Sequence, residues 1–93
     1  MKLRFSSNFD IFERHSTQCY LLYWETEQIF RINRTLYLFL SIIRKKANNE
    51  FMEFEEVLKS LASKVAFESM EQVRDDFLEM VTDLKLKGVL EVA

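Results

Sequence analysis

The stretch Gln18–Leu40, QCYLLYWETEQIFRINRTLYLFL, decides how this chain folds. Residues 18–23 and 28–32 are rich in apolar and aromatic side chains that favour β-strands. The four residues from Trp24 to Glu27 predict a turn between these strands. Asn33 then suits a helix N-cap, because its side-chain oxygen can accept an unpaired backbone N–H. The stretch therefore predicts two strands, the second of which passes directly into a helix.

Residues 9–14, FDIFER, alternate well enough to predict a strand before this pair, with Phe9, Ile11 and Phe12 as candidates for burial. Apolar residues at helical spacing predict helices over 34–46, 54–64 and 70–87. Ser69 and Gln72 form a capping box at the start of the last helix. Residues 51–52 and 89–92 are each compatible with a further short strand.

These elements predict one domain over residues 1–93 with an α+β fold of winged-helix character. A three-stranded antiparallel sheet (9–14, 18–23 and 28–32) precedes three helices in this arrangement. The composition, 48% hydrophobic and 30% charged, is that of a globular protein. A single cysteine, Cys19, excludes an internal disulfide and fits a reducing compartment.

Membrane insertion and secretion are not expected. The first ten residues lack the apolar segment of a secretory signal. The longest apolar run, 36–43, is far shorter than the roughly 20 residues that a membrane span requires. We therefore expect a cytoplasmic protein.

Catalysis is not expected either. His15 is the sole histidine, and Cys19 lies in a predicted strand without an activating base. Neighbouring acids such as Asp75 and Asp76 do not face each other on a helix. The sequence has no glycine-rich phosphate loop and no set of metal ligands. We expect a protein that is not an enzyme and that has no catalytic residue, metal site or cofactor.

Binding to DNA is disfavoured by charge. In a winged-helix domain the third helix would enter the groove of the duplex. From Ser69 to Gly88 it carries five acidic residues against three basic ones, so it would repel phosphates. We expect no nucleic-acid partner.

Peptide binding is favoured instead. Strand 28–32 ends the predicted meander, so one of its edges lacks a partner, and an open edge accepts an added strand. The last helix would form the second wall of a groove. There Leu78 lies just outside the apolar stripe and is flanked by Arg74 and Lys85, which would suit an acidic, apolar peptide. The alternative is that Leu78 is simply the border of the core stripe.

The order of elements resembles the PqqD-like family, the recognition elements for RiPP precursor peptides. The resemblance covers residues 9–92. It rests on IFRINRTLYLFL (29–40), FEEVLKSL (54–61) and MEQVRDDFLEMVTDLKLKGVLEV (70–92), in which Leu86-Lys87-Gly88-Val89-Leu90 resembles the family's closing Leu-Lys-x-Gly-hydrophobic-Leu pattern without its intervening residue. The chain departs from the family at residues 44–51 and 24–27, where no glycine is present.

The resemblance implies that the chain binds the leader of a precursor peptide as an added strand. It would present that leader to a separate modifying enzyme, such as a radical SAM enzyme, a cyclase or a protease. Arg31 and Arg34 would pair with acidic leader residues. By position, the implied peptide-binding residues are Gln28, Ile29, Phe30, Arg31, Ile32, Arg74, Phe77, Leu78, Val81 and Lys85.

Two alternatives remain open at this point. One is a winged-helix regulator or adaptor that binds another protein or, less readily, DNA. The other is a structural subunit that forms a homodimer through the exposed strand edge.

Overall fold

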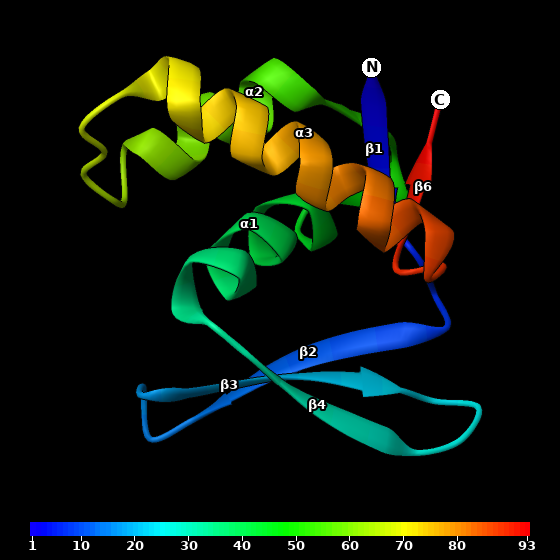
Figure 1. Ribbon diagram of the computed structural model, residues 1–93. Coiled ribbons are helices and arrows are strands. Elements are labelled where there is room, and N and C mark those ends of the chain that lie inside the picture. The colour runs from blue at the N-terminus through cyan, green and yellow to red at the C-terminus, as the bar shows by residue number, and fades with distance from the viewer.

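The computed structural model describes residues 1–93, apart from the side chain of Ala47 (Figure 1). The predicted strands have the expected bounds. The predicted helices begin where expected and end one or two residues earlier. The elements in chain order are β1 (Lys2–Phe5), β2 (Phe9–Arg14), β3 (Gln18–Tyr23), β4 (Gln28–Ile32), α1 (Arg34–Arg44), a 3-10 turn (Ala47–Asn49), β5 (Met52–Glu53), α2 (Phe54–Ala62), α3 (Met70–Leu86) and β6 (Leu90–Val92). The predicted α+β fold is confirmed.

Strands β2, β3 and β4 form an antiparallel meander, which we call the meander sheet. In its register, Leu21 of β3 lies opposite Ile11 of β2 on one side and Phe30 of β4 on the other. Strand β4 pairs with β3 alone among the described strands, so it lies at an edge of the sheet. The Asn33 side chain accepts the Leu36 N–H at 2.7 Å. The predicted cap between β4 and α1 is confirmed.

A second antiparallel sheet has the order β5-β1-β6. The sequence did not predict β1, whereas β5 and β6 correspond to the two short segments that it left open. The backbone N–H of Lys2 donates to the Ala93 carbonyl at 2.9 Å, and the Ala93 N–H donates to the Lys2 carbonyl at 2.9 Å. The two ends of the chain therefore lie side by side (Figure 1).

Gly88 ends α3 and turns the chain into β6. Its φ of 80° lies in the left-handed region that glycine adopts without strain. The next N–H, that of Val89, donates to the Leu84 carbonyl at 2.9 Å. This turn places Val89 and Leu90 in the core, where both are buried.

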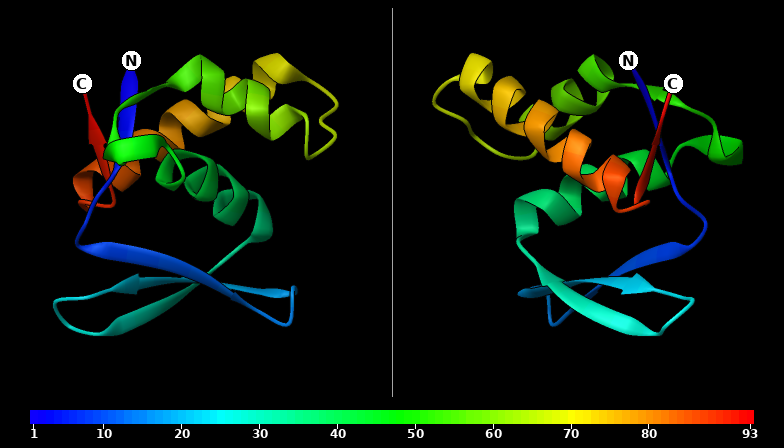
Figure 2. Two further views of the ribbon diagram at one scale, coloured as in Figure 1. Left: turned by 180° about the vertical axis from the view of Figure 1, so that it is seen from behind. Right: turned by 45° about the vertical axis from the view of Figure 1, so that its right-hand side comes forward.

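The helices α1, α2 and α3 all lie on one side of the meander sheet, as Figure 2 shows from two directions. The core fills the space between them, and the Phe39 and Phe77 rings meet there with centroids 4.6 Å apart. Ile11 and Leu21 contribute to this core from the sheet, and Cys19 is buried beside them. Phe12 was a candidate for burial, but it lies on the outer face of the sheet and is exposed. Among the described residues, no helix is both long and apolar enough to cross a bilayer.

Candidate functional site

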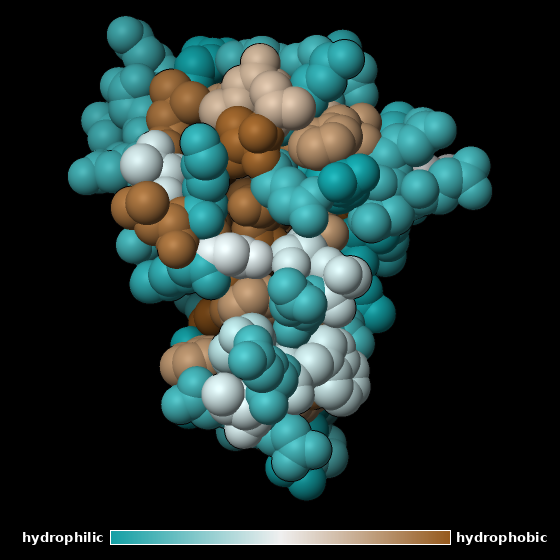
Figure 3. All heavy atoms as spheres, turned by 90° about the vertical axis from the view of Figure 1, so that its right-hand side faces the viewer, coloured by the Kyte–Doolittle hydropathy of each residue, from teal (hydrophilic) through white to brown (hydrophobic). Residues whose placement is uncertain are grey.

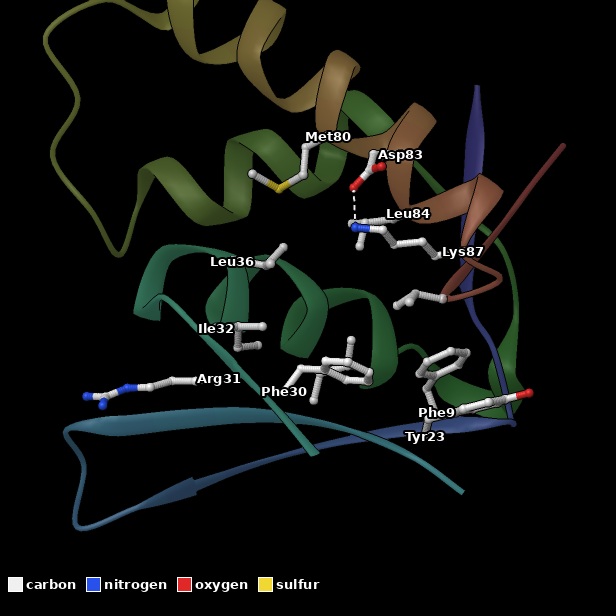
Figure 4. Close-up of a pocket in the computed structure, with 12 residues that line it drawn as sticks. Phe9, Tyr23, Phe30, Arg31, Ile32, Leu36, Met80, Asp83, Leu84 and Lys87 are labelled. Atoms are coloured by element: carbon white, nitrogen blue, oxygen red, sulfur yellow. Dashed lines mark ion pairs between the residues drawn. The ribbon is translucent and has the colours of Figure 1, made fainter. Parts of the chain in front are cut away.

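A cavity of about 560 Å³ opens between the meander sheet, the start of α1 and the C-terminal half of α3 (Figure 4). Most of its lining is apolar or aromatic, and the only charged lining residues described are Arg31, Asp83 and Lys87. The full lining consists of Phe9, Leu21, Tyr23, Phe30, Arg31, Ile32, Leu36, Met80, Asp83, Leu84, Lys87 and Val89. An apolar cleft with a few polar groups at its rim is the usual form of a binding site.

The sheet forms the floor of the cavity. Phe30 and Ile32 alternate along β4 and therefore share the inner face with Leu21. At one end the Phe9 and Tyr23 rings stack with centroids 4.8 Å apart. A hydrogen bond from the Tyr23 hydroxyl to the Glu25 carboxylate raises the pKa of Tyr23. Figure 3 views the side of the molecule that carries the β3–β4 turn, and it shows hydrophobic surface in the upper half with paler and hydrophilic residues below.

One flank of α3 forms the opposite wall. Met80, Asp83, Leu84 and Lys87 have the spacing that places side chains on one side of a helix. Lys87 Nζ lies 2.9 Å from Asp83 Oδ2 at the rim. Because both groups are exposed, this ion pair contributes little stability. It remains available for exchange with a charged ligand.

The edge of the meander sheet at β2 is covered by side chains. The Asp10 carboxylate accepts the Ile11 N–H at 2.8 Å, and Arg44 of α1 donates to the Ile11 carbonyl at 3.0 Å. Arg44 Nη1 also lies 2.8 Å from Asp10 Oδ1. Both main-chain groups of Ile11 are thus satisfied without a further strand.

The edge at β4 is open. Both main-chain groups of Ile11 point away from β3, so Ile11 and Leu21 form a pair without mutual hydrogen bonds. Such pairs alternate with hydrogen-bonded ones, which makes Leu21 and Phe30 a hydrogen-bonded pair. The N–H and C=O groups of the neighbouring residues, Ile29 and Arg31, are therefore directed away from the sheet. They run alongside the cavity.

The predicted strand residues Gln28 to Ile32 form β4, and three of them, Phe30, Arg31 and Ile32, line the cavity. Ile29 points to the outer face and is 58% exposed. Gln28 accepts a hydrogen bond from Thr26 at 2.9 Å beside the turn. Figure 4 shows the Arg31 guanidinium directed away from the cavity.

The predicted helix residues do not line the cavity. Phe77 and Val81 are buried in the core. Leu78 and Lys85 are exposed outside the cavity lining. The structure thus brings the opposite flank of α3 to the sheet.

Arg74, the remaining predicted helix residue, faces α2. It donates two hydrogen bonds to the Glu55 carboxylate, at 2.8 and 2.9 Å. These bonds lower the pKa of Glu55 and raise that of Arg74. Arg74 is therefore engaged in holding α3 against α2.

Sequence reasoning missed nine residues of the cavity: Phe9, Leu21, Tyr23, Leu36, Met80, Asp83, Leu84, Lys87 and Val89. Met80 and Leu84 belong to the apolar stripe of α3 that packs on the core, and they line the cavity as well. Asp83 and Lys87 are spaced for an ion pair on a helix and lie next to these apolar residues. This pattern could have indicated a second flank of α3 that is both apolar and charged.

The sequence matches no family profile and no curated protein. Among solved structures, the fold resembles that of TbiB1 in complex with the TbiA(beta) leader peptide. The TM-score is 0.74, over 97% of this chain and 96% of that chain, with 16% sequence identity. This likeness agrees with the PqqD-like fold that the sequence resemblance implied.

Proposed function

We propose that this protein binds the leader segment of a ribosomally synthesised precursor peptide and presents it to a separate modifying enzyme. The observation that carries this proposal is the open edge of β4 directly beside an apolar cavity. The similarity in fold to TbiB1, whose structure contains a leader peptide, supports it. The chain itself would act by binding, without a catalytic step.

The open edge favours an extended peptide over a folded or small-molecule ligand. The outward N–H and C=O groups of Ile29 and Arg31 would form ladder hydrogen bonds with an added strand. Alternate side chains of that strand would enter the cavity between Phe30 and Met80. The leader should therefore carry apolar residues at every second position over a short segment.

The charges at the rim favour an acidic group on the leader. Among the described side chains, Arg31 has no ion-pair partner. Arg34, by contrast, donates to Glu13 at 2.9 Å and to the Ser16 carbonyl at 3.1 Å, and the bond to Glu13 raises the pKa of Arg34. Arg31 is therefore the stronger candidate of the two to pair with a leader carboxylate.

The test is a titration of ¹⁵N-labelled protein with a synthetic leader from the precursor peptide encoded beside its gene. We expect amide shifts to cluster on residues 28–32 and 80–89. A peptide of the same composition in scrambled order is the control. If the authentic leader leaves these amides unchanged while duplex DNA shifts them, the protein is a regulator instead. Sedimentation without ligand distinguishes a homodimer through β4.

A further inference from the structure

The outer face of the meander sheet carries large apolar side chains. Ile11 is buried, so its neighbours along β2 point outward. Phe12 lies opposite Tyr20, and their rings stack with centroids 5.0 Å apart. Leu22 and Ile29 lie opposite each other in the adjacent position of the same face. We call these four residues, Phe12, Tyr20, Leu22 and Ile29, the outer patch.

No described segment of the chain covers the outer patch. The helices lie on the other side of the sheet (Figures 1 and 2). Phe12 is 36% exposed and Ile29 is 58% exposed. Single exposed apolar residues are ordinary, but aromatic and aliphatic groups gathered on one face are typical of contact surfaces.

Two arginines border the patch. Arg14 ends β2, and Arg31 lies opposite Tyr20 on the outer face. Among the described side chains, neither has a carboxylate within ion-pair distance. The other four arginines each have one: Arg4, Arg34, Arg44 and Arg74. Since Arg31 would pair with a leader carboxylate, Arg14 remains for a partner protein. An apolar centre with a cation at its border complements a protein surface with an apolar centre and an acidic border.

A leader bound to β4 would extend this same face. An added strand continues the alternation of the sheet, so every second leader side chain would point outward beside Ile29 and Arg31. The other side chains would enter the cavity. The leader thus has one set of residues in contact with this protein and a second set displayed next to the outer patch.

We propose that the outer patch docks the modifying enzyme, through an apolar surface of that enzyme bordered by acidic residues. The outward side chains of the bound leader form part of the docked surface. This inference rests on the proposed function and assigns its partner surface. It also assigns the side chains of the leader to two partners: this protein contacts the inward residues, and the enzyme contacts the outward ones.

The first test uses Phe12→Glu, with Leu86→Glu as the matched control, because Leu86 is 82% exposed and lies outside both the cavity and the outer patch. Binding is measured by biolayer interferometry against the leader peptide and against each purified enzyme encoded by the flanking genes. We expect Phe12→Glu to bind the leader within about twofold of the wild type and the enzyme at least about tenfold more weakly. Leu86→Glu should bind both as the wild type does.

Equal enzyme affinity of Phe12→Glu and the wild type would overturn the proposal. So would a leader-saturated wild type that binds none of these enzymes. If Phe12→Glu does not fold, Arg14→Glu replaces it with the same expected result. If the wild type does not bind the leader at all, the proposed function is refuted instead. Failure of the docking proposal and failure of the proposed function are therefore distinguishable.

The second test changes the leader. An outward residue of the leader is replaced by lysine. Binding of this leader to the protein alone is measured first, and binding of the resulting complex to the enzyme is measured second. We expect unchanged affinity in the first measurement and weaker enzyme binding in the second. Unchanged enzyme binding would exclude the leader from the docked surface. If sedimentation shows that the wild type dimerises and Phe12→Glu does not, the patch is a self-interface and the proposal fails.

Discussion

Phe30 lies directly opposite Leu21 in the β3–β4 ladder, yet Phe30 is 46% exposed and Leu21 only 7%. Both side chains are on the inner face of the sheet. Both side chains line the cavity, but Leu21 lies on the central strand and belongs to the core, whereas Phe30 lies on the edge strand. An apolar side chain held at an open position in this way favours ligand binding over fold stability.

Replacing these two residues should separate binding from stability. We expect Leu21→Ala to lower the free energy of unfolding by about 3 kcal/mol, since it leaves a void in the core. Phe30→Ala should cost roughly 1 kcal/mol, because about half of the side chain is already in contact with water. Phe30→Ala should nevertheless weaken leader binding about tenfold or more. Urea denaturation and calorimetric titration measure the two effects, and a larger stability loss for Phe30→Ala would contradict the assignment.

Ile29→Pro should weaken leader binding while the domain stays folded. Proline removes the outward N–H of residue 29, which pairs with no described strand in the free protein but would donate to an added one. The loss of one ladder hydrogen bond corresponds to about tenfold in affinity. Ile29→Val keeps the N–H and serves as the control. Binding of the proline variant at wild-type affinity, with a dispersed amide spectrum, would exclude strand addition at β4.

A matched pair of charge insertions tests which flank of α3 forms the groove wall. Met80 lines the cavity and Leu78 does not. We expect Met80→Glu to lower leader affinity at least about tenfold and Leu78→Glu to leave it unchanged. Fluorescence of the sole tryptophan, Trp24, or calorimetry gives the affinities. The reverse result would place the peptide on the flank of Arg74 and Lys85 that the sequence indicated.

Arg44 should protect the β2 edge from association. Its bonds to Asp10 and to the Ile11 carbonyl occupy groups that a further strand would otherwise pair with. We expect Arg44→Met to lower the free energy of unfolding by about 1 kcal/mol and to increase self-association. Sedimentation at several concentrations measures the second effect. Arg14→Met, which removes an arginine without a described ion-pair partner, is the control and should remain like the wild type.

The sequence correctly predicts the strands and helices whose ends are set by neighbouring residues, such as helix caps. Asn33 caps α1 as its position indicated, and Ser69 caps α3 by accepting the Gln72 N–H at 3.3 Å. Strand β1 gave no such signal. Its four residues pair with β5 and β6, far away in the chain, so its existence depends on partners that a local pattern does not contain.

The candidate site was predictable on one side only. The order of strands placed β4 at an edge, because a meander must end there. The sequence could not decide between the two flanks of α3, since both borders of its apolar stripe carry apolar and charged residues. In the structure Phe77 packs on Phe39 of α1, and Met80 rather than Leu78 lines the cavity. Packing between segments far apart in the sequence therefore determines which flank of α3 faces the sheet.

The pairing of β1 with β6 determines when, during folding, the binding groove is completed. Leu3 must find Val92, which is almost the longest separation that this chain allows, and such contacts form late. Lys87 and Val89, at the rim and wall of the cavity, lie directly before β6. During synthesis the residues of β2, β3 and β4 emerge long before these residues do. We therefore expect the part of the cavity wall at Lys87 and Val89 to be completed last, when β6 pairs with β1.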